Sequence, residues 1–222
     1  MSDHDLDTLL RTRRSVRAFL NRPVPDQLVR ECLDLAQTAP SNCNAQPWRV
    51  HLASGEARDR LAMALGRAFD AQENETIEHP MEVFTGEYHD LQVACAIGMY
   101  DKMGIKRADR VARRRAHARN FAFFDAPHAA IVCMDKSFGV GAALDIGIWV
   151  QTFLLALTSR GIQSCTQASI RSYPHILRDV LNIPAELTPL CAIAFGYEDP
   201  SNPINTLKTA RNGLDGNITM AT

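Results

Sequence analysis

The sequence of 222 residues has no excess of charge of either sign, since 24 Lys and Arg residues stand against 25 Asp and Glu residues. This balance gives no global reason to expect nucleic acid or an anionic membrane as a partner. No run of about 18 apolar residues is free of charge, so we expect no transmembrane helix. The first residues are acidic and no apolar segment precedes a small-residue cleavage site, so we expect no signal peptide.

Cysteine and histidine motifs are also missing. None of the six cysteines forms a C-x-x-C pair and most lie in apolar runs, which favours free thiols in a reducing cytoplasm. The seven histidines include no H-x-x-x-H pair, so we expect no metal site, and His128 is expected to be a satisfied core or rim residue. Gly139 and Gly141 begin a dinucleotide fingerprint, but Leu144 occupies the place of its third glycine.

The apolar pattern predicts a helix-rich chain with about four separated strands. We expect helices over 3–13, 26–39, 54–71, 91–119, 144–159 and 173–181, with strands over 48–53, 129–134 and 190–197 and a polar strand or turn over 162–170. Asp26 is a candidate cap for the second helix. The helix over 144–159 is apolar nearly all round, which places it in the core or at a subunit interface. This order indicates a single α+β domain over 1–222 with a three-layer core.

Two polar motifs lie in the first quarter of the chain. Arg13, Arg14, Ser15 and Arg17 concentrate three guanidiniums and a hydroxyl, a donor set suited to phosphate, although a solvated helix end has the same composition. The segment 40–48 (PSNCNAQPW) then places amide side chains between two prolines. Amides both donate and accept, as reading the edge of a heteroaromatic ring requires, and the alternative is a simple turn.

Two further motifs lie in the second half. The segment 161–169 (GIQSCTQAS) has small residues that let a planar ligand approach backbone N–H groups, or it is a helix-terminating glycine followed by a strand. Lys208 and Arg211 lie in a short cationic stretch near the C-terminus, which alone is only a polar tail.

The four motifs together resemble the FMN-dependent nitroreductase family, over about residues 9–211. The specific parts are R-R-S-V-R and P-S-x-x-N-x-Q-P-W, in that order, before a long apolar helix and G-I-x-S-C. The resemblance implies a central, mainly antiparallel sheet flanked by helices, in an intertwined homodimer. It also implies FMN as cofactor, NADPH or NADH as electron donor, and a small electron-poor aromatic acceptor.

The resemblance implies roles residue by residue. Arg13, Arg14, Ser15 and Arg17 would hold the FMN phosphate and ribityl chain and touch the pyrimidine side of the ring, with Lys208 and Arg211 completing the phosphate clamp. Pro40, Ser41, Asn42 and Asn44 would reach FMN from the other subunit. Backbone groups around Gln167, Ala168 and Ser169 would lie along the flavin near N5 and O4.

The implied activity is hydride transfer from NAD(P)H to nitroaromatic or quinone-like acceptors by a ping-pong mechanism. Flavin N5 would carry the chemistry, and we expect no side chain to act as general acid or base. Alternatives are another reductive reaction at the same flavin site, such as dehalogenation, or a flavin-binding module without turnover.

Three regions remain to be placed. We expect residues 72–119 to form a lid-like insertion. Within it, the positive charge of Arg113, Arg114 and Arg115 would favour an anionic acceptor, such as a nitrobenzoate, or the NADPH 2′-phosphate. The alternative is that these arginines form a solvated helix face. Phe123 and Phe124 are candidates for the acceptor pocket, although we expect at least one to lie in the core. The chain ends in a C-terminal extension, 198–222, and its last part, 212–222, either wraps the partner subunit or is disordered.

Overall fold

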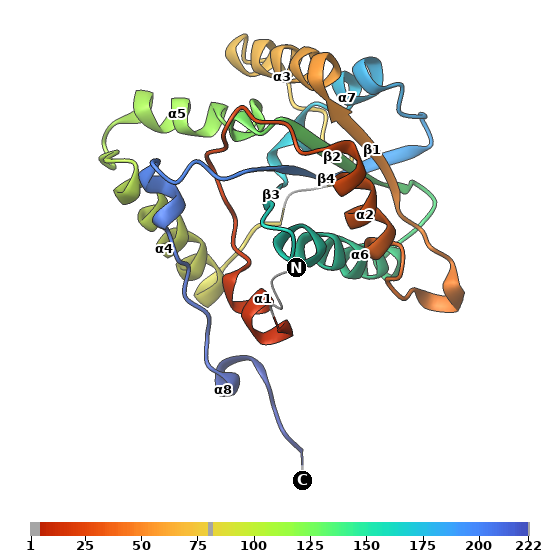
Figure 1. The fold of residues 1–222 in the computed structure, drawn as a ribbon. Coiled ribbons are helices and arrows are strands. Elements are labelled where there is room, and N and C mark those ends of the chain that lie inside the picture. The colour runs from red at the N-terminus through yellow and green to blue at the C-terminus, as the bar shows by residue number, and fades with distance from the viewer. Residues whose placement is uncertain (1–4, 80–81, 222) are drawn as a thin grey trace.

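The computed structural model describes residues 5–79 and 82–221. These residues form a four-stranded sheet with helices on both faces (Figure 1). The strands are β1 (Arg49–Ser54), β2 (His128–Asp135), β3 (Gln163–Gln167) and β4 (Leu187–Gly196), in the order β1-β2-β4-β3, and each neighbouring pair is antiparallel. The α+β class and the antiparallel sheet expected from the sequence are confirmed.

Five of the six expected helices are present with shifted ends, and the one expected over 91–119 is divided. The helices are α1 (Leu6–Thr12), α2 (Asp26–Ala36), α3 (Gly55–Asp70), α4 (Gly86–Lys102), α5 (Arg110–Ala118), α6 (Val140–Thr158), α7 (Pro174–Leu181) and α8 (Leu214–Asn217), with short 3-10 turns η1 (Asn42–Asn44), η2 (Phe123–Asp125), η3 (Ser169–Ser172) and η4 (Pro203–Thr206). The expected cap at Asp26 is wrong. Pro25 is the N-cap, and its carbonyl accepts the first bonds from Leu28 and Val29.

The single helix expected over 91–119 is two helices, α4 and α5. Helix α4 ends where Gly104 adopts a φ of +66°, a conformation that costs glycine little and other residues more. Helix α5 then starts from Asp109, whose Oδ1 accepts a 2.9 Å hydrogen bond from the N–H of Ala112. The break lets the two helices take different directions beside the sheet (Figure 1).

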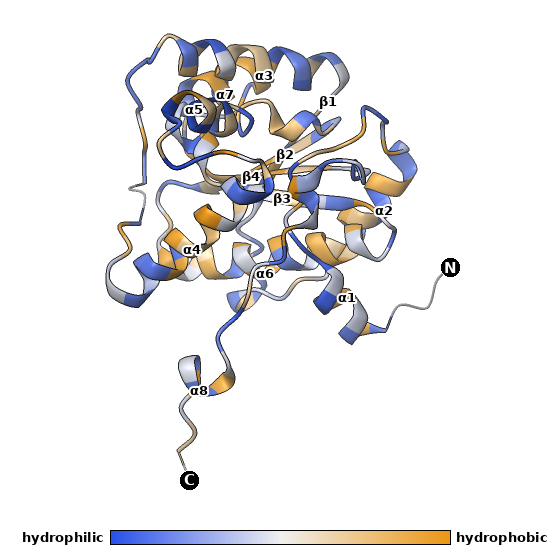
Figure 2. Cartoon of the chain, turned by 90° about the vertical axis from the view of Figure 1, so that its left-hand side faces the viewer, coloured by the Kyte–Doolittle hydropathy of each residue, from blue (hydrophilic) through white to orange (hydrophobic). Residues whose placement is uncertain are grey.

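Strand β2 divides the core into two halves because both of its faces are buried. Ala129, Ile131 and Cys133 pack into a cluster covered by α3 and α7, whereas Ala130, Val132 and Met134 pack into a second cluster covered by α2 and α6. Helices therefore lie above and below the sheet, and the expected three-layer core is confirmed (Figures 1 and 2).

Helix α6 is, within the part of the chain that the structure describes, the one helix long and apolar enough to span a membrane. Core helices of water-soluble proteins meet the same criterion, and Trp149, Phe153 and Leu157 on α6 are buried against the sheet. The helix is thus a core helix, as expected. Its other side leaves Val140 and Leu144 exposed.

The C-terminal segment leaves the body of the molecule. Beyond η4 the chain passes α4 and then extends away from the sheet, and α8 lies apart from the other helices (Figures 1 and 2). Leu214, Ile218 and Met220 are all exposed there. In a single chain this segment has no apolar surface to cover its hydrophobic side chains.

Candidate functional site

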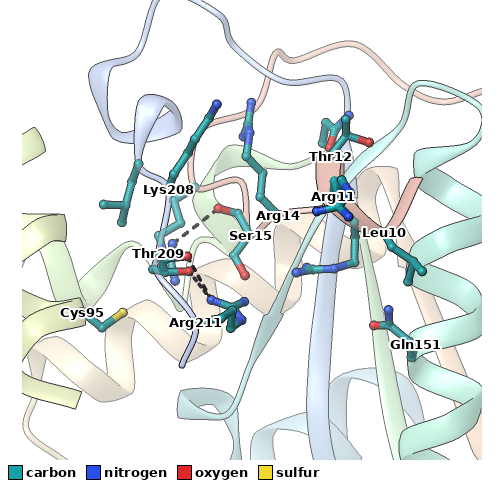
Figure 3. Close-up of a pocket in the computed structure, with 14 residues that line it drawn as sticks. Leu10, Arg11, Thr12, Arg14, Ser15, Cys95, Gln151, Lys208, Thr209 and Arg211 are labelled. Carbon is teal, nitrogen blue, oxygen red and sulfur yellow. Dashed lines mark hydrogen bonds between the residues drawn. The ribbon is translucent and has the colours of Figure 1, made fainter. Parts of the chain in front are cut away.

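The larger candidate site is a cavity of about 980 Å³ between the segment that follows α1, helix α6, strand β3 and the segment that follows η4 (Figure 3). It is lined by Leu10, Arg11, Thr12, Arg13, Arg14, Ser15, Arg17, Cys95, Gln151, Gln163, Leu207, Lys208, Thr209 and Arg211. We call it the cationic cavity. It brings together the first and fourth sequence motifs, which lie almost 200 residues apart in the chain.

The R-R-S-V-R segment is held against the open edge of β3. Ser15 forms a parallel bridge with Ser164, and the N–H of Val16 donates a 3.0 Å hydrogen bond to the carbonyl of Ser164. The N–H of Arg17 donates to Oδ1 of Asn205, which ties the same segment to η4. These bonds place one basic side chain after another along the wall of the cavity.

The charges in the cationic cavity are largely uncompensated by the protein. Six lining residues are Arg or Lys, and none is Asp or Glu. Burial, and then the nearby positive charge of Arg211, lower the pKa of Arg13. Like charges held together cost free energy, so such a cluster fits an anionic ligand such as a phosphate. The donor set therefore fits the phosphate of FMN.

Arg14 has a carboxylate partner. Its Nη2 lies 2.6 Å from both Oε1 and Oε2 of Glu198, just beyond β4. Both groups are partly buried, and the pair fastens the N-terminal segment to the end of the sheet. Glu198 compensates much of the charge of Arg14, which also lines the cationic cavity, and a contact between Arg14 and FMN stays a prediction.

The cationic cavity also contains residues that sequence reasoning missed: Arg11, Gln151 and Gln163. Gln151 was the more visible of the two amides, because it is one of the few polar side chains in the largely apolar helix α6. Gln163 begins β3, and its segment had been singled out only from its small residues further along. The two side chains add neutral donors and acceptors to the cavity wall.

The amide loop does not reach the cationic cavity of its own chain. Pro40, Ser41, Asn42 and Asn44 line none of that cavity, and most of the loop is exposed. The loop is nevertheless ordered internally. Oγ of Ser41 accepts a hydrogen bond from the N–H of Gln46, and Asn44 has a φ of +57°. The expected contact of this loop with the FMN of a second subunit stays a prediction.

The end of β3 leads to a second, smaller cavity of about 280 Å³. It is lined by Arg17, Met99, Tyr100, Met103, Ala116, His117, Arg119, Asn120, Phe124, Ser169 and Ile204. We call it the α4–α5 cavity. Arg17 lines both cavities, so they adjoin. Of the three residues expected along the flavin, Ser169 lines this cavity. Gln167 is buried, and its Nε2 donates a hydrogen bond to the carbonyl oxygen of Asn120. Ala168 directly precedes η3.

Phe123 and Phe124 lie in different surroundings. Phe123 has no exposed surface and lies in the core beneath α3, so its assignment to the acceptor pocket is wrong, and the expectation that at least one of the pair is a core residue is confirmed. Phe124 lines the α4–α5 cavity. Both residues have positive φ, and with Asp125 they form three consecutive left-handed residues. Only tertiary packing can hold such a turn.

The three arginines singled out in the basic stretch line neither cavity. Arg114 stacks over Phe69 at 4.3 Å from the ring centre and donates to the carbonyl of Phe69. Arg113 lies over Tyr100, and Arg115 is exposed. Arg119, from the end of the same stretch, does line the α4–α5 cavity. The residue of the basic stretch whose charge faces a cavity is therefore Arg119, and not Arg113, Arg114 or Arg115 as expected.

The chain is similar to known proteins over most of its length. Residues 10–197 match the model of the Nitroreductase family. The 4-nitrobenzoate reductase of Pseudomonas putida is 32% identical over 212 residues, which cover 96% of this chain and 93% of the relative. The nitrobenzene nitroreductase of Ectopseudomonas oleovorans is 33% identical over 217 residues, which cover 95% of this chain and 94% of the relative.

A solved structure is similar over nearly the whole length. The FMN-dependent nitroreductase NfnB from Mycobacterium smegmatis, crystallised in complex with NADPH, superposes with a TM-score of 0.94 at 34% identity and covers 97% of each chain. On its fold, its motifs and these relatives, this chain is a member of the nitroreductase family.

Proposed function

We propose that the protein is an FMN-dependent oxidoreductase that passes two electrons from NAD(P)H to nitroaromatic or quinone-like acceptors. The observation that carries this proposal is the cationic cavity, in which Arg13, Lys208 and Arg211 converge without a carboxylate to neutralise them. The names of the relatives support it, since one reduces 4-nitrobenzoate, another nitrobenzene, and a third binds NADPH.

The side chains would bind and orient rather than transfer protons. Arg13, Lys208 and Arg211 would hold the phosphate, and Gln151 and Gln163 would hydrogen-bond to the rest of the cofactor. FMN, when bound, supplies the hydride chemistry. In the overall reaction NAD(P)H and a proton convert a nitro group to a nitroso group and water, leaving NAD(P)⁺. Ser169, which lines the α4–α5 cavity, would position the acceptor.

We also propose that the active form is a homodimer. Helix α6 exposes Val140, Leu144 and Ile148, and neighbouring exposed apolar side chains of this kind are typical of an interaction surface. The amide loop, 40–48, carries donors and acceptors that its own cavity does not use. The C-terminal extension ends in exposed hydrophobic residues that a second subunit would cover. A cytoplasmic location stays a prediction, supported by six free cysteines.

An absorbance spectrum of the purified protein, followed under anaerobic conditions, tests the activity. We expect flavin bands that bleach with NADPH or NADH and return when a nitroaromatic is added. A bound flavin that neither nicotinamide reduces would favour a flavin-binding module. Loss of halide from a halogenated aromatic, without nitro reduction, would favour the dehalogenation alternative.

A further inference from the structure

The α4–α5 cavity combines an apolar wall with a cationic one. Met99, Tyr100, Met103 and Phe124 form the apolar side. Methionine side chains are flexible and polarisable, so they adapt to a ring of varying substitution. Arg17 and Arg119 provide the charge, and Asn120 and Ser169 provide neutral polar groups. No residue lining this cavity is Asp or Glu, so its lining leaves positive charge for a ligand to neutralise.

Arg119 has capacity to bind a further anion. Its Nη2 donates to Oδ2 of Asp125 at 3.1 Å. The side chain of Asp125 is 66% exposed, and pairs that water screens to this extent are weak. A guanidinium has five N–H donors, so one bond to Asp125 leaves the others for a planar carboxylate. Arg17, by comparison, is shared with the cationic cavity and is expected to contact the cofactor.

The other cations of the basic stretch are placed differently. Arg114 is committed to Phe69, and Arg113 lies over the ring of Tyr100. His117 packs against the rings of both Phe69 and Phe121, and desolvation lowers its pKa, so it is mainly neutral at pH 7. Within the described residues, Arg119 is therefore the charged side chain that belongs to the α4–α5 cavity alone.

We infer that the α4–α5 cavity is the acceptor pocket and that Arg119 makes it selective for single-ring aromatic acceptors that carry a carboxylate. The inference rests on the proposed function and deepens it. A volume of 280 Å³ lies just below the range of about 300–1,000 Å³ typical of pockets for larger ligands, which favours one substituted ring. Relatives of nearly equal identity act on 4-nitrobenzoate and on nitrobenzene, so similarity alone does not choose between the two.

The test compares two isosteric acceptors, 4-nitrobenzoate and 4-nitrobenzamide, in the FMN-loaded enzyme and in Arg119→Gln. The selectivity is the ratio of kcat/KM for the acid to kcat/KM for the amide. We expect this substitution to lower the ratio roughly ten- to hundredfold, mainly through KM of the acid, since a charge-assisted hydrogen bond is lost. An unchanged ratio would overturn the inference.

Two matched variants separate a direct contact between Arg119 and the carboxylate of the acceptor from other causes of the selectivity. Arg115→Gln removes the same charge from an exposed position on α5, and we expect the ratio to stay within about twofold, because water screens the charge. If Arg115→Gln lowered the ratio as much as Arg119→Gln, a general field rather than a contact would be responsible.

Asp125→Asn keeps a residue that tolerates left-handed φ and releases Arg119, so the ratio should hold or rise. A fall equal to that of Arg119→Gln would mean that Arg119 acts only through this ion pair.

A binding measurement without turnover separates this inference from the proposed function. Calorimetric titration of the oxidised, FMN-loaded protein with benzoate and with benzamide should give tighter binding of benzoate, and Arg119→Gln should remove the difference. Equal binding of the two by the unmodified protein would overturn the inference. If neither nitro compound is reduced while benzoate still binds preferentially, the proposed function fails and the anion site stands.

Discussion

The backbone N–H of Asn42 donates a 3.0 Å hydrogen bond to Oδ2 of Asp145. Asp145 is the one charged residue of α6 and is largely buried, so its carboxylate needs such a partner. The bond connects the amide loop, which lies outside its own chain's cavity, to the central helix. Asp145 thus sets where the loop is presented.

Replacing Asp145 by Ala should destabilise the protein by about 1–3 kcal/mol, because the N–H of Asn42 loses its acceptor in a partly buried place. Urea unfolding measures this change, with Asp59→Ala as control. Asp59 is exposed and pairs only with its neighbour Arg58, so its loss should cost less than about 0.5 kcal/mol. Asp145→Asn keeps a carbonyl oxygen and should retain most of the stability. Equal losses for Ala and Asn would show that charge, and not this hydrogen bond, is what matters.

Glu78 pins the segment between α3 and α4 to the body of the protein. Its carboxylate lies 2.8 Å from Nη2 of Arg178 and 3.0 Å from Nζ of Lys136. Burial acts to raise the pKa of Glu78, but the hydrogen bonds from Arg178 and Lys136 outweigh it, and the pKa is lowered. The contribution to stability is therefore present above the pKa of the unfolded chain and lost as the pH falls through the lower folded value.

Glu78→Gln should consequently reduce the free energy of unfolding at pH 7 by about 1–3 kcal/mol. The difference from the unmodified protein should shrink once the pH falls below the pKa of an unfolded glutamate, about 4.3, and it should vanish below the lowered pKa of folded Glu78. Denaturant unfolding at pH 7, 5 and 3.5 measures this dependence. A difference that does not vary with pH would contradict the account of the ion pairs.

Leu144→Asp tests the proposed dimer. A carboxylate in the apolar face of α6 would be buried without a partner at an interface, so we expect a monomer that has lost FMN. Light scattering after gel filtration, with the flavin absorbance recorded, measures both. Met63→Asp, at an exposed position on α3, is the control and should remain a dimer with flavin. An unmodified protein that is a monomer and still binds FMN would contradict the proposal.

Local patterns in the sequence were enough to predict the α+β class and the buried elements. The continuous apolar run of β2 and the all-apolar character of α6 indicated a layered core, whereas the antiparallel sheet was implied by the family resemblance. His128 was expected to be satisfied, and its Nε2 accepts from the N–H of Val24 while Nδ1 lies 2.6 Å from Oγ of Ser54. The convergence of R-R-S-V-R with Lys208 and Arg211 required the family resemblance in addition, because no local pattern connects such distant segments.

The features of the site that the sequence did not predict depend on long-range contacts and on the rotation of helices. Arg14 is paired with Glu198, 184 residues away, and nothing near Arg14 in the sequence indicates this. Which arginine of a basic stretch faces a cavity depends on where the helix begins, and α5 begins only at Arg110 because Gly104 interrupts the pattern. The left-handed turn at Phe123 and Phe124 is set by packing, and their sequence gives no sign of it.

The central claim is that the cationic cavity holds the phosphate of FMN, and the binding of FMN against riboflavin tests it most directly. Titration of the apoprotein, followed by flavin fluorescence, gives both affinities. We predict that FMN binds at least about a hundredfold more tightly than riboflavin, and that Arg211→Gln reduces this difference roughly tenfold or more while affecting riboflavin little. Equal affinities for FMN and riboflavin would contradict the claim, since the phosphate would then lie away from Arg13, Lys208 and Arg211.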